Sequence, residues 1–182
     1  MNVAKLREVF GEWPLRVGEF FKVGYEQFHK DWLDTFPDAY DEEKIKDAHY
    51  FLKCPIRATT GSGGYDFYSP LTFILEPNEE IKIPTGIRVQ IEPGWVLKLY
   101  PKSGLGFKYY SRMANTIPVV DGDYYYSDNE GHIFVKLRNE GTKTMTIQEG
   151  DKFCQGIFEI YGIVKYDNAQ GVRNGGFGST GK

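Results

Sequence analysis

The feature that most constrains the fold is a change of sequence texture near residue 50. From Tyr50 onward, short runs rich in Ile, Val, Tyr, Phe and Thr are separated by Gly, Pro and Asn. Such runs predict short β-strands joined by turns. Because no helical spacers separate them, we expect an all-β antiparallel sandwich or jelly roll. The expected strands are residues 50–58, 65–68, 71–75, 80–83, 86–91, 95–100, 117–120, 132–138, 143–147 and 153–165.

The first fifty residues follow a different pattern. Apolar residues recur at helical spacing within residues 3–13 and again within residues 17–32, which predicts two short amphipathic helices. Residues 38–47 are mostly acidic and are expected to be solvated. We therefore divide the chain into an N-terminal helical extension at 1–49 and a β domain at 50–170.

The remaining residues, 171–182, are expected to form a flexible glycine-rich arm. Residues 169–182 contain five glycines and almost no apolar surface, so they cannot fold alone. The final string, GGFGSTGK (175–182), could cradle a phosphate, because glycines let successive amides converge on an anion. It lacks the spacing of a Walker A loop. From these residues alone, a disordered tail and a ligand-binding arm both stay open.

Composition and charge exclude several classes of protein. With 25 acidic and 22 basic side chains the net charge is −3, which argues against a broad nucleic-acid-binding surface. Any polyphosphate ligand must be held locally. Cys54 and Cys154 form neither a zinc cluster nor a disulfide scaffold. No run approaches about 18 apolar residues and no signal peptide is visible, so we expect a cytoplasmic protein without membrane contact.

Two internal strings could bind an anion or a metal. Residues 101–106, PKSGLG, offer a cation, a hydroxyl and unhindered amides, but they could equally form a tight glycine turn. Residues 115–123, NTIPVVDGD, end in two carboxylates at positions i and i+2. These carboxylates could be a metal clamp, a base with a helper, or a polar loop.

The ordered set of strings is more specific than any one of them. In sequence order they are ATTGSGGYDFYS (58–69), PTGIRVQI (84–91), PKSGLGFK (101–108), NTIPVVDGDY (115–124), TIQEGDKFCQGIF (146–158) and RNGGFGSTG (173–181). Across about residues 50–182 the chain resembles the trimeric dUTPase family, with all five family motifs in order. The resemblance implies a jelly-roll subunit, a homotrimer with active sites shared between chains, and Mg²⁺ held mainly by the nucleotide triphosphate.

The resemblance also implies an activity. The family hydrolyses dUTP to dUMP and pyrophosphate, which limits uracil incorporation into DNA and supplies dUMP for dTMP synthesis. By this resemblance Asp121 is the general base. An aspartate is ordinarily ionised at neutral pH, so it can orient a water and accept its proton as the water attacks the α-phosphorus.

Further roles follow from the same resemblance. Backbone groups in the turn would read uracil, the ring of Tyr124 would pack under the deoxyribose, and the Asp66 carboxylate would lie near Mg²⁺ through a water. In the arm, Phe177 would stack on uracil and Arg173 would pair with the γ-phosphate. The uracil-reading residues are Asn115, Ile117, Val119 and Val120, and the phosphate contacts are Lys102, Ser103, Gly104, Gln155, Gly178, Ser179 and Thr180.

The chain departs from the family pattern in four places. Lys102 stands where the family usually has Arg, and the fifth motif is one residue shorter than usual before its glycines. About five residues, YYSDN (125–129), are inserted after Tyr124 and are expected to lengthen a hairpin at the pocket rim. The extension at 1–49 has no counterpart in the minimal subunit, so it could pack on the trimer or dock another protein.

Two other functions are weighed against dUTP hydrolysis. dCTP deaminases are built on the same fold, but they have an Arg-Ser-Ser string in the second motif, whereas this chain has Lys102-Ser103-Gly104. A regulatory binding protein could instead use the nucleotide as a switch, with residues 1–49 as its partner surface. The intact set of motifs favours catalysis.

Overall fold

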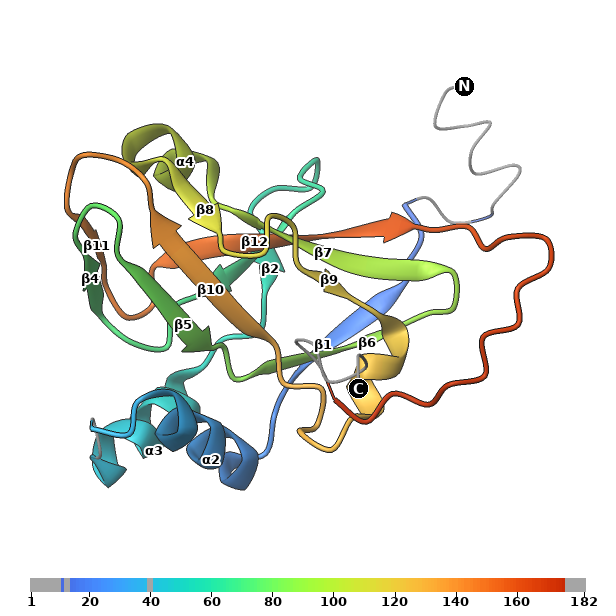
Figure 1. The fold of residues 1–182 in the computed structure, drawn as a ribbon, viewed down its shortest axis with the longest axis horizontal. Helices are drawn as coiled ribbons and strands as arrows, with labels where there is room; N and C mark the ends of the chain where they lie inside the picture. Colours follow the sequence, from blue (N-terminus) through green and yellow to red (C-terminus); the bar gives the residue numbers. More distant parts are fainter. Residues whose placement is uncertain (1–10, 12–13, 39–40, 176–182) are drawn as a thin grey trace.

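A computed structural model describes residue 11, residues 14–38 and residues 41–175 of the chain. Short strands dominate, with three α-helices and one 3₁₀-helix among the described residues (Figure 1). The strands are β1 (Gly18–Lys22), β2 (Ile56–Arg57), β3 (Tyr65–Tyr68), β4 (Phe73–Leu75), β5 (Glu80–Pro84), β6 (Ile87–Ile91), β7 (Trp95–Pro101), β8 (Ser111–Met113), β9 (Val119–Val120), β10 (Phe134–Asn139), β11 (Met145–Ile147) and β12 (Lys152–Ile160). The helices are α2 (Tyr25–Thr35), α3 (Glu42–Phe51), α4 (Ser103–Tyr109) and the 3₁₀-helix η1 (Gly122–Tyr126).

The strands pair antiparallel in four sheets. The largest has the order β2-β3-β12-β7-β9, and the others are β5-β10-β8, β1-β6 and β11-β4. Alternate residues of β10 point inward, as expected of a strand with one buried face. The sheets enclose one apolar core, so the all-β jelly-roll prediction is confirmed. Among its most buried side chains are Phe67, Ile83, Leu97, Leu99, Ile133, Leu137, Met145 and Phe153.

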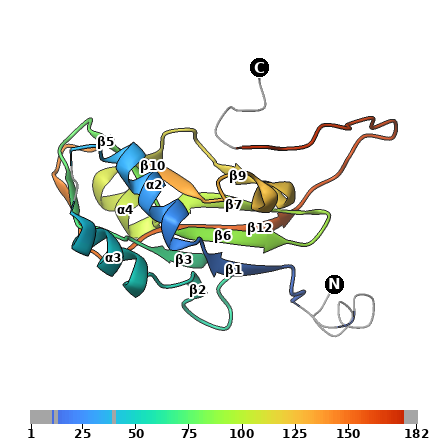
Figure 2. The ribbon, with the colours of Figure 1, turned by 90° about the horizontal axis from the view of Figure 1, so that it is seen from below.

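Residues 18–51, called here the N-terminal segment, are packed onto this β body. Strand β1 pairs with β6 along its whole length, from Gly18 opposite Ile91 to Lys22 opposite Ile87. Helices α2 and α3 lie together on one side of the sheets (Figure 2). Their apolar faces form a second cluster made of Val23, Phe28, Trp32, Ile45, Ala48 and Leu52.

The helix predicted for residues 17–32 is wrong in its first part, which forms β1. The backbones come close at Gly18, where a Cβ would lie 2.9 Å from the carbonyl oxygen of Gln90. Pairing with β6 gives backbone hydrogen bonds to this segment. This pairing outweighs the apolar spacing, which suits a helix and a strand equally. The helix begins only at Tyr25. The helix predicted within residues 3–13 lies outside the described residues, apart from Gly11.

Other predicted elements also need correction. The acidic segment is helical from Glu42, because the Asp41 side chain accepts a hydrogen bond from the amide of Lys44 at 3.2 Å and caps α3. Of the strand expected at 50–58, only Ile56–Arg57 is formed, since α3 runs to Phe51. Helix α3 thus continues through residue 49, and the division of the chain there stays a prediction.

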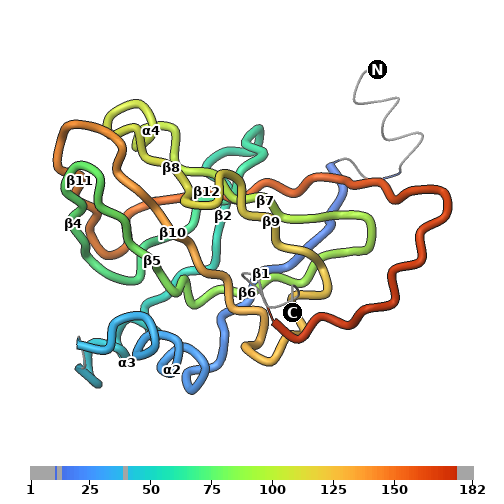
Figure 3. The backbone as a smooth tube through the Cα atoms, in the orientation of Figure 1, coloured from blue at the N-terminus to red at the C-terminus, as the bar shows by residue number. Residues whose placement is uncertain are grey.

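The last strand ends earlier than expected, at Ile160. The chain from residue 161 to residue 175 then runs outward and returns to the side of β9 and η1, as the tube in Figure 3 shows. None of the described helices is long and apolar enough to cross a membrane.

Candidate active site

A buried carboxylate held by two lysines lies at one end of the largest sheet. Asp66, on β3, has a side chain only 3% exposed. The ammonium of Lys102 donates a hydrogen bond to its Oδ1 at 2.5 Å, and the ammonium of Lys152 lies 2.9 Å from its Oδ2. Gln155 stands opposite Asp66 in the β12–β3 register. We call these four residues the lysine cluster.

The charge state of the lysine cluster follows from its contacts. Burial raises the pKa of Asp66, but the hydrogen bond from Lys102 and the contact with Lys152 outweigh it, so the pKa lies below its ordinary value. Oδ2 forms an ion pair with Lys152 but accepts no well-aligned hydrogen bond from the described residues. This oxygen is buried.

The burial of this acceptor bears on how the cluster fits Mg²⁺. The two lysines disfavour direct binding of a divalent cation to Asp66, and Oδ2, buried beside Lys152, is not open to a water of the hydrated ion. Mg²⁺ commonly keeps several waters and uses substrate phosphates as ligands. No group of three or more acidic, His or Cys side chains able to hold a metal occurs in the described part of the chain. The contact of Asp66 with Mg²⁺ through a water stays a prediction.

The second-motif residues follow directly on β7. Lys102 precedes α4, which replaces the loop or turn expected for this string. Ser103 and Gly104 are exposed on the first turn of the helix. Gly104, Lys108 and Lys152 help to line an open pocket of about 550 Å³ beside the cluster. Two lysines and the glycine at the start of α4 thus share this pocket with one carboxylate, Asp151.

Gln155 shares the face of Asp66, and its side chain lies against Gly64. A Cβ at Gly64 would come 2.8 Å from Oε1 of Gln155. The glycine in the first-motif string therefore leaves the space that the Gln155 amide occupies.

The third motif forms an exposed turn between two sheets. Asn115 and Thr116 are exposed, Thr116 has a φ of 66°, and the amide of Ile117 donates to the carbonyl of Asn115 at 2.8 Å. Val119 is 51% exposed, whereas Val120 is buried opposite Leu97. The residues expected to read uracil therefore lie on this turn and on β9, which follows it.

Directly after this turn, two carboxylates meet the arginine of the fifth motif. Asp121 is 41% and Asp123 58% exposed at the side chain. Arg173 donates from Nη2 to Oδ2 of Asp121 at 2.5 Å and from Nε to Oδ1 of Asp123 at 2.9 Å. We call residues 121–124 the aspartate turn. Arg173 contacts the third motif here, and its expected contact with a γ-phosphate stays a prediction.

Tyr124, also in the aspartate turn, is only 4% exposed. Its hydroxyl donates to the carbonyl of His132 at 2.6 Å and accepts from Nδ2 of Asn129 at 2.8 Å. Burial raises the pKa of its phenol. The position of the ring is therefore fixed by the protein, and its contact with a sugar stays a prediction.

Residues 125–131, called here the rim loop, follow Tyr124. They were expected to lengthen a hairpin, but β9 pairs with β7 whereas β10 pairs with β5 and β8. The rim loop is therefore a connection between two sheets, and that prediction is wrong. The predicted contacts of Phe177, Gly178, Ser179 and Thr180 lie outside the described residues.

Sequence reasoning missed Lys152, although it stands three residues before Gln155 in the fourth-motif string. In a regular strand Lys152 would share a face with the buried Cys154, opposite to Asp66. The β12–β3 register shifts between Lys152 and Cys154, so the lysine reaches the carboxylate. A β-bulge of this kind gives no clear signal in the sequence.

Comparison with known proteins gives relatives from one family. The dUTPase family model matches residues 52–181. A deoxyuridine 5'-triphosphate nucleotidohydrolase of Lactococcus lactis is 37% identical over 71% of this chain and 89% of its own, and one of Paraburkholderia phymatum is 32% identical over 76% and 96%.

Solved structures agree with the sequence comparison. The crystal structure of a dUTPase from Streptococcus mutans superposes with a TM-score of 0.58 at 25% identity, covering 80% of this chain and 98% of its own. A dUTPase from phage phi11 of Staphylococcus aureus gives 0.54 at 22% identity, covering 66% and 90%, and supports the fold. From its five ordered motifs, the extent of the family match and these likenesses, the chain belongs to the dUTPase family.

Proposed function

We propose that the protein hydrolyses dUTP to dUMP and pyrophosphate by attack of an Asp121-activated water on the α-phosphorus. The observation that carries this proposal is the contact between Asp121 and Arg173. These residues lie 52 positions apart, in the third and fifth motifs, and meet at 2.5 Å. A carboxylate that is still 41% exposed beside a phosphate-binding side chain suits a general base.

In the chemical step, an Oδ atom of Asp121 holds the water in line and accepts its proton. The water oxygen bonds to the α-phosphorus while the bond from that phosphorus to the bridging oxygen breaks. The electron pair leaves with pyrophosphate. General base catalysis of this kind contributes on the order of 10²–10⁴ in rate.

Phosphate binding falls to the lysine cluster and the start of α4. The ammonium groups of Lys102 and Lys152 supply positive charge, and the Ser103 hydroxyl and the Gly104 amide supply hydrogen bonds. Bound Mg²⁺ would offset negative charge on the triphosphate. The arm residues Phe177 to Thr180 would close over the base and the β- and γ-phosphates.

Discrimination for uracil falls to the exposed turn at 115–120. Main-chain donors and acceptors cannot rotate away, so they match one base edge and leave cytosine with unpaired groups. Sites of this type reject a mismatched analogue by about 10⁴ or more.

A homotrimer with shared active sites is part of the proposal. Val120 stands opposite Leu97 on β7, whereas Lys102 follows Pro101 on the same strand. Four residues of strand span about 13 Å, and Asp121 and Lys102 lie beyond opposite ends of that span. We infer that a second subunit completes each of these two parts of the site. The end of β12 and the segment after it also expose Ile160, Tyr161, Ile163, Val164 and Tyr166, as an interface would.

The test is pyrophosphate release from a panel of deoxynucleoside triphosphates with Mg²⁺, together with the mass of the assembly by light scattering. We expect release from dUTP alone and the mass of three chains. Ammonia from dCTP would instead identify a deaminase. Tight dUTP binding without turnover would favour a regulatory binding protein, and a monomer that turns over dUTP would refute the shared site. A cytoplasmic location also stays a prediction.

A further inference from the structure

The extension contacts both the insertion at 125–129 and the residue that follows it, Glu130. The amide of Gly24, at the start of α2, donates to Oε2 of Glu130 in the rim loop at 2.8 Å. The rings of Phe21 and Tyr125 lie with their centroids 5.9 Å apart. The N-terminal segment and the rim loop are therefore one structural unit beside Tyr124.

Arg88, on β6, binds the rim loop at two points. It donates to the carbonyl of Tyr125 at 2.7 Å, and its guanidinium lies 3.8 Å from the centroid of that ring. Its Nη1 also lies 3.5 Å from Oε2 of Glu130. The loop is thus held from the β body as well as from the N-terminal segment.

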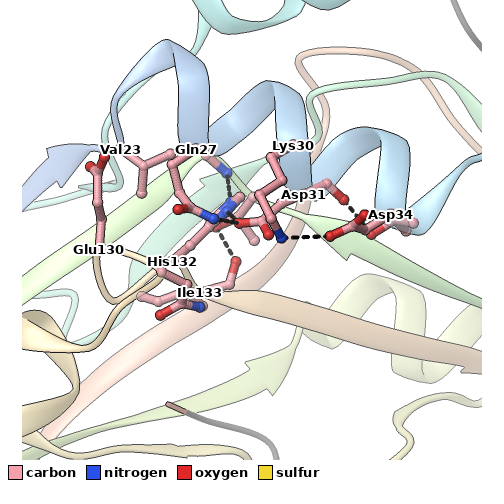
Figure 4. Close-up of polar contacts among 12 residues, drawn as sticks. Val23, Gln27, Lys30, Asp31, Asp34, Glu130, His132 and Ile133 are labelled. Carbon is pink, nitrogen blue, oxygen red and sulfur yellow. Dashed lines mark hydrogen bonds and ion pairs between the residues drawn. The ribbon is translucent and has the colours of Figure 1, made fainter. Parts of the chain in front are cut away.

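A buried hydrogen-bonded pair links α2 to the residues after the loop (Figure 4). Asp31 on α2 accepts from Nδ1 of His132 at 2.6 Å, and the His132 side chain is fully buried. The amide of Gly86 donates to Nε2 of His132 at 2.8 Å. Because a backbone amide can only donate, Nε2 carries no proton, so the imidazole is neutral with its proton on Nδ1. Asp31 thereby fixes both the tautomer and the orientation of the ring.

His132 in turn holds Tyr124 through its backbone, since the tyrosine hydroxyl donates to the His132 carbonyl at 2.6 Å. The amide of Tyr124 donates to the carbonyl of Asp121 at 3.2 Å. Hydrogen bonds, joined by the covalent structure of His132 and Tyr124, therefore connect α2 to the aspartate turn.

We propose that Asp31 is a positioning residue that fixes Tyr124 through His132 and thereby sets discrimination between 2'-deoxyribose and ribose nucleotides. The inference rests on the proposed function, because it takes Tyr124 as the ring beside the sugar. A ring held at its hydroxyl cannot retreat to admit a 2'-hydroxyl. Loss of this connection would let the ring shift, and a displacement of about 1 Å can change rates by about 10²-fold.

The test compares Asp31→Ala with Asp34→Ala, which changes an exposed acid on the same helix that pairs with Lys30. The readout is the ratio of kcat/KM for dUTP to that for UTP. We expect Asp31→Ala to lower this ratio by about 10- to 100-fold and Asp34→Ala to leave it unchanged. A merely structural role would reduce the active fraction and lower both substrates alike.

Two further variants separate positioning from folding. Asp31→Asn keeps an oxygen acceptor for Nδ1 of His132, so it should hold the ratio near that of the unsubstituted enzyme. Tyr124→Phe removes the hydroxyl, so it should lower the ratio, and adding Asp31→Ala should lower it no further. If Asp31→Ala fails to fold, Asp31→Leu takes its place, with the pocket filled by apolar atoms.

The outcomes distinguish the two proposals. An unsubstituted enzyme that turns over dUTP, with a ratio unchanged in a folded Asp31→Ala or Asp31→Leu variant, overturns the positioning role alone. Independent, multiplicative effects of Asp31→Ala and Tyr124→Phe overturn it as well. An unsubstituted enzyme that leaves dUTP intact overturns the proposed function, and the positioning role falls with it.

Discussion

The lysine cluster and the aspartate turn both place a carboxylate beside cations, but they do so in opposite environments. Asp66 is 3% exposed and contacts two lysines, whereas Asp121 is 41% exposed and contacts one arginine from the arm. A buried carboxylate depends on its partners for solvation. An exposed one can exchange a partner for water or substrate at little cost. The comparison separates a buried carboxylate held by two cations from an exposed one that can exchange its partner, which is what the proposed roles of Asp66 and Asp121 require.

Removing the charge of the exposed carboxylate, Asp121, should have the largest effect. Asp121→Asn should lower kcat for dUTP by on the order of 10²–10⁴ while leaving nucleotide affinity largely intact, because the amide cannot accept the proton. Single-turnover pyrophosphate release and equilibrium titration with a non-hydrolysable analogue measure the two effects. Asp123→Asn is the matched control and should retain most turnover. Near-normal release by Asp121→Asn would refute the assignment.

The arm provides the next largest effect. Deleting residues 173–182 should lower turnover by on the order of 10²-fold without changing the mass of the assembly, because phosphate contacts are lost. Ordering these residues costs about 1–2 kcal/mol each, so we expect closure only over bound nucleotide. Steady-state kinetics and light scattering test this. Deleting only Gly181 and Lys182 is the control, and a long deletion with normal turnover would contradict the proposed lid.

Removing a cation beside the buried carboxylate, Asp66, should lower the stability of the fold. Lys102→Met leaves Asp66 with one cation, so the free energy of unfolding should fall by on the order of 1–3 kcal/mol in urea denaturation. Lys98→Met is the control on the same strand, because its partner Glu159 is 37% exposed. That change should cost about 1 kcal/mol or less. Equal losses in the two variants would show that burial does not distinguish the carboxylates.

The pair of Asp31 and His132 extends the comparison to a group that titrates near neutrality. Burial lowers the pKa of His132 below 6.5, and this outweighs the opposite effect of Asp31. The unfolded chain then binds the proton more tightly, so stability is present above about pH 6.5 and falls as the pH drops below it. The free energy of unfolding should fall by at most about 1.4 kcal/mol per pH unit because of this group.

Urea midpoints at pH 7.0 and 5.5 measure this effect. The decrease should persist in His29→Asn, which leaves the His132 site untouched. A stability that does not change between the two pH values would contradict the neutral, buried state of His132.

The sequence predicted the β body well because its strands alternate and its turns carry Gly, Pro and Asn. The strand expected at 65–68 matches β3, and that expected at 95–100 falls one residue short of β7. The prediction for residues 17–32 was less successful, because Phe20 and Phe21 fit a helical spacing and a strand equally. Only the partner strand β6 decides between them, and it lies about seventy positions away.

The candidate site was predictable to the extent that motifs carry it. Asp66, Asp121 and Gln155 were each identified from the ordered strings, although their roles stay predictions. The contact between Asp31 and His132 spans 101 positions and involves one residue in the extension, outside the family pattern. Such a pair depends on how α2 packs on the β body, which no local pattern in the sequence reveals.

The pairing of β1 with β6 has a practical consequence for N-terminally truncated versions of this protein. The family match begins at residue 52, so a shortened version starting there would look complete by similarity. It would nevertheless lose the strand that pairs with β6, leave a row of unpaired amides and carbonyls along β6, and uncover Leu52 and Leu71, which pack in the apolar cluster of α2 and α3. Open edges of this kind recruit other chains. We therefore expect a version of this enzyme that begins at residue 52 to aggregate during purification.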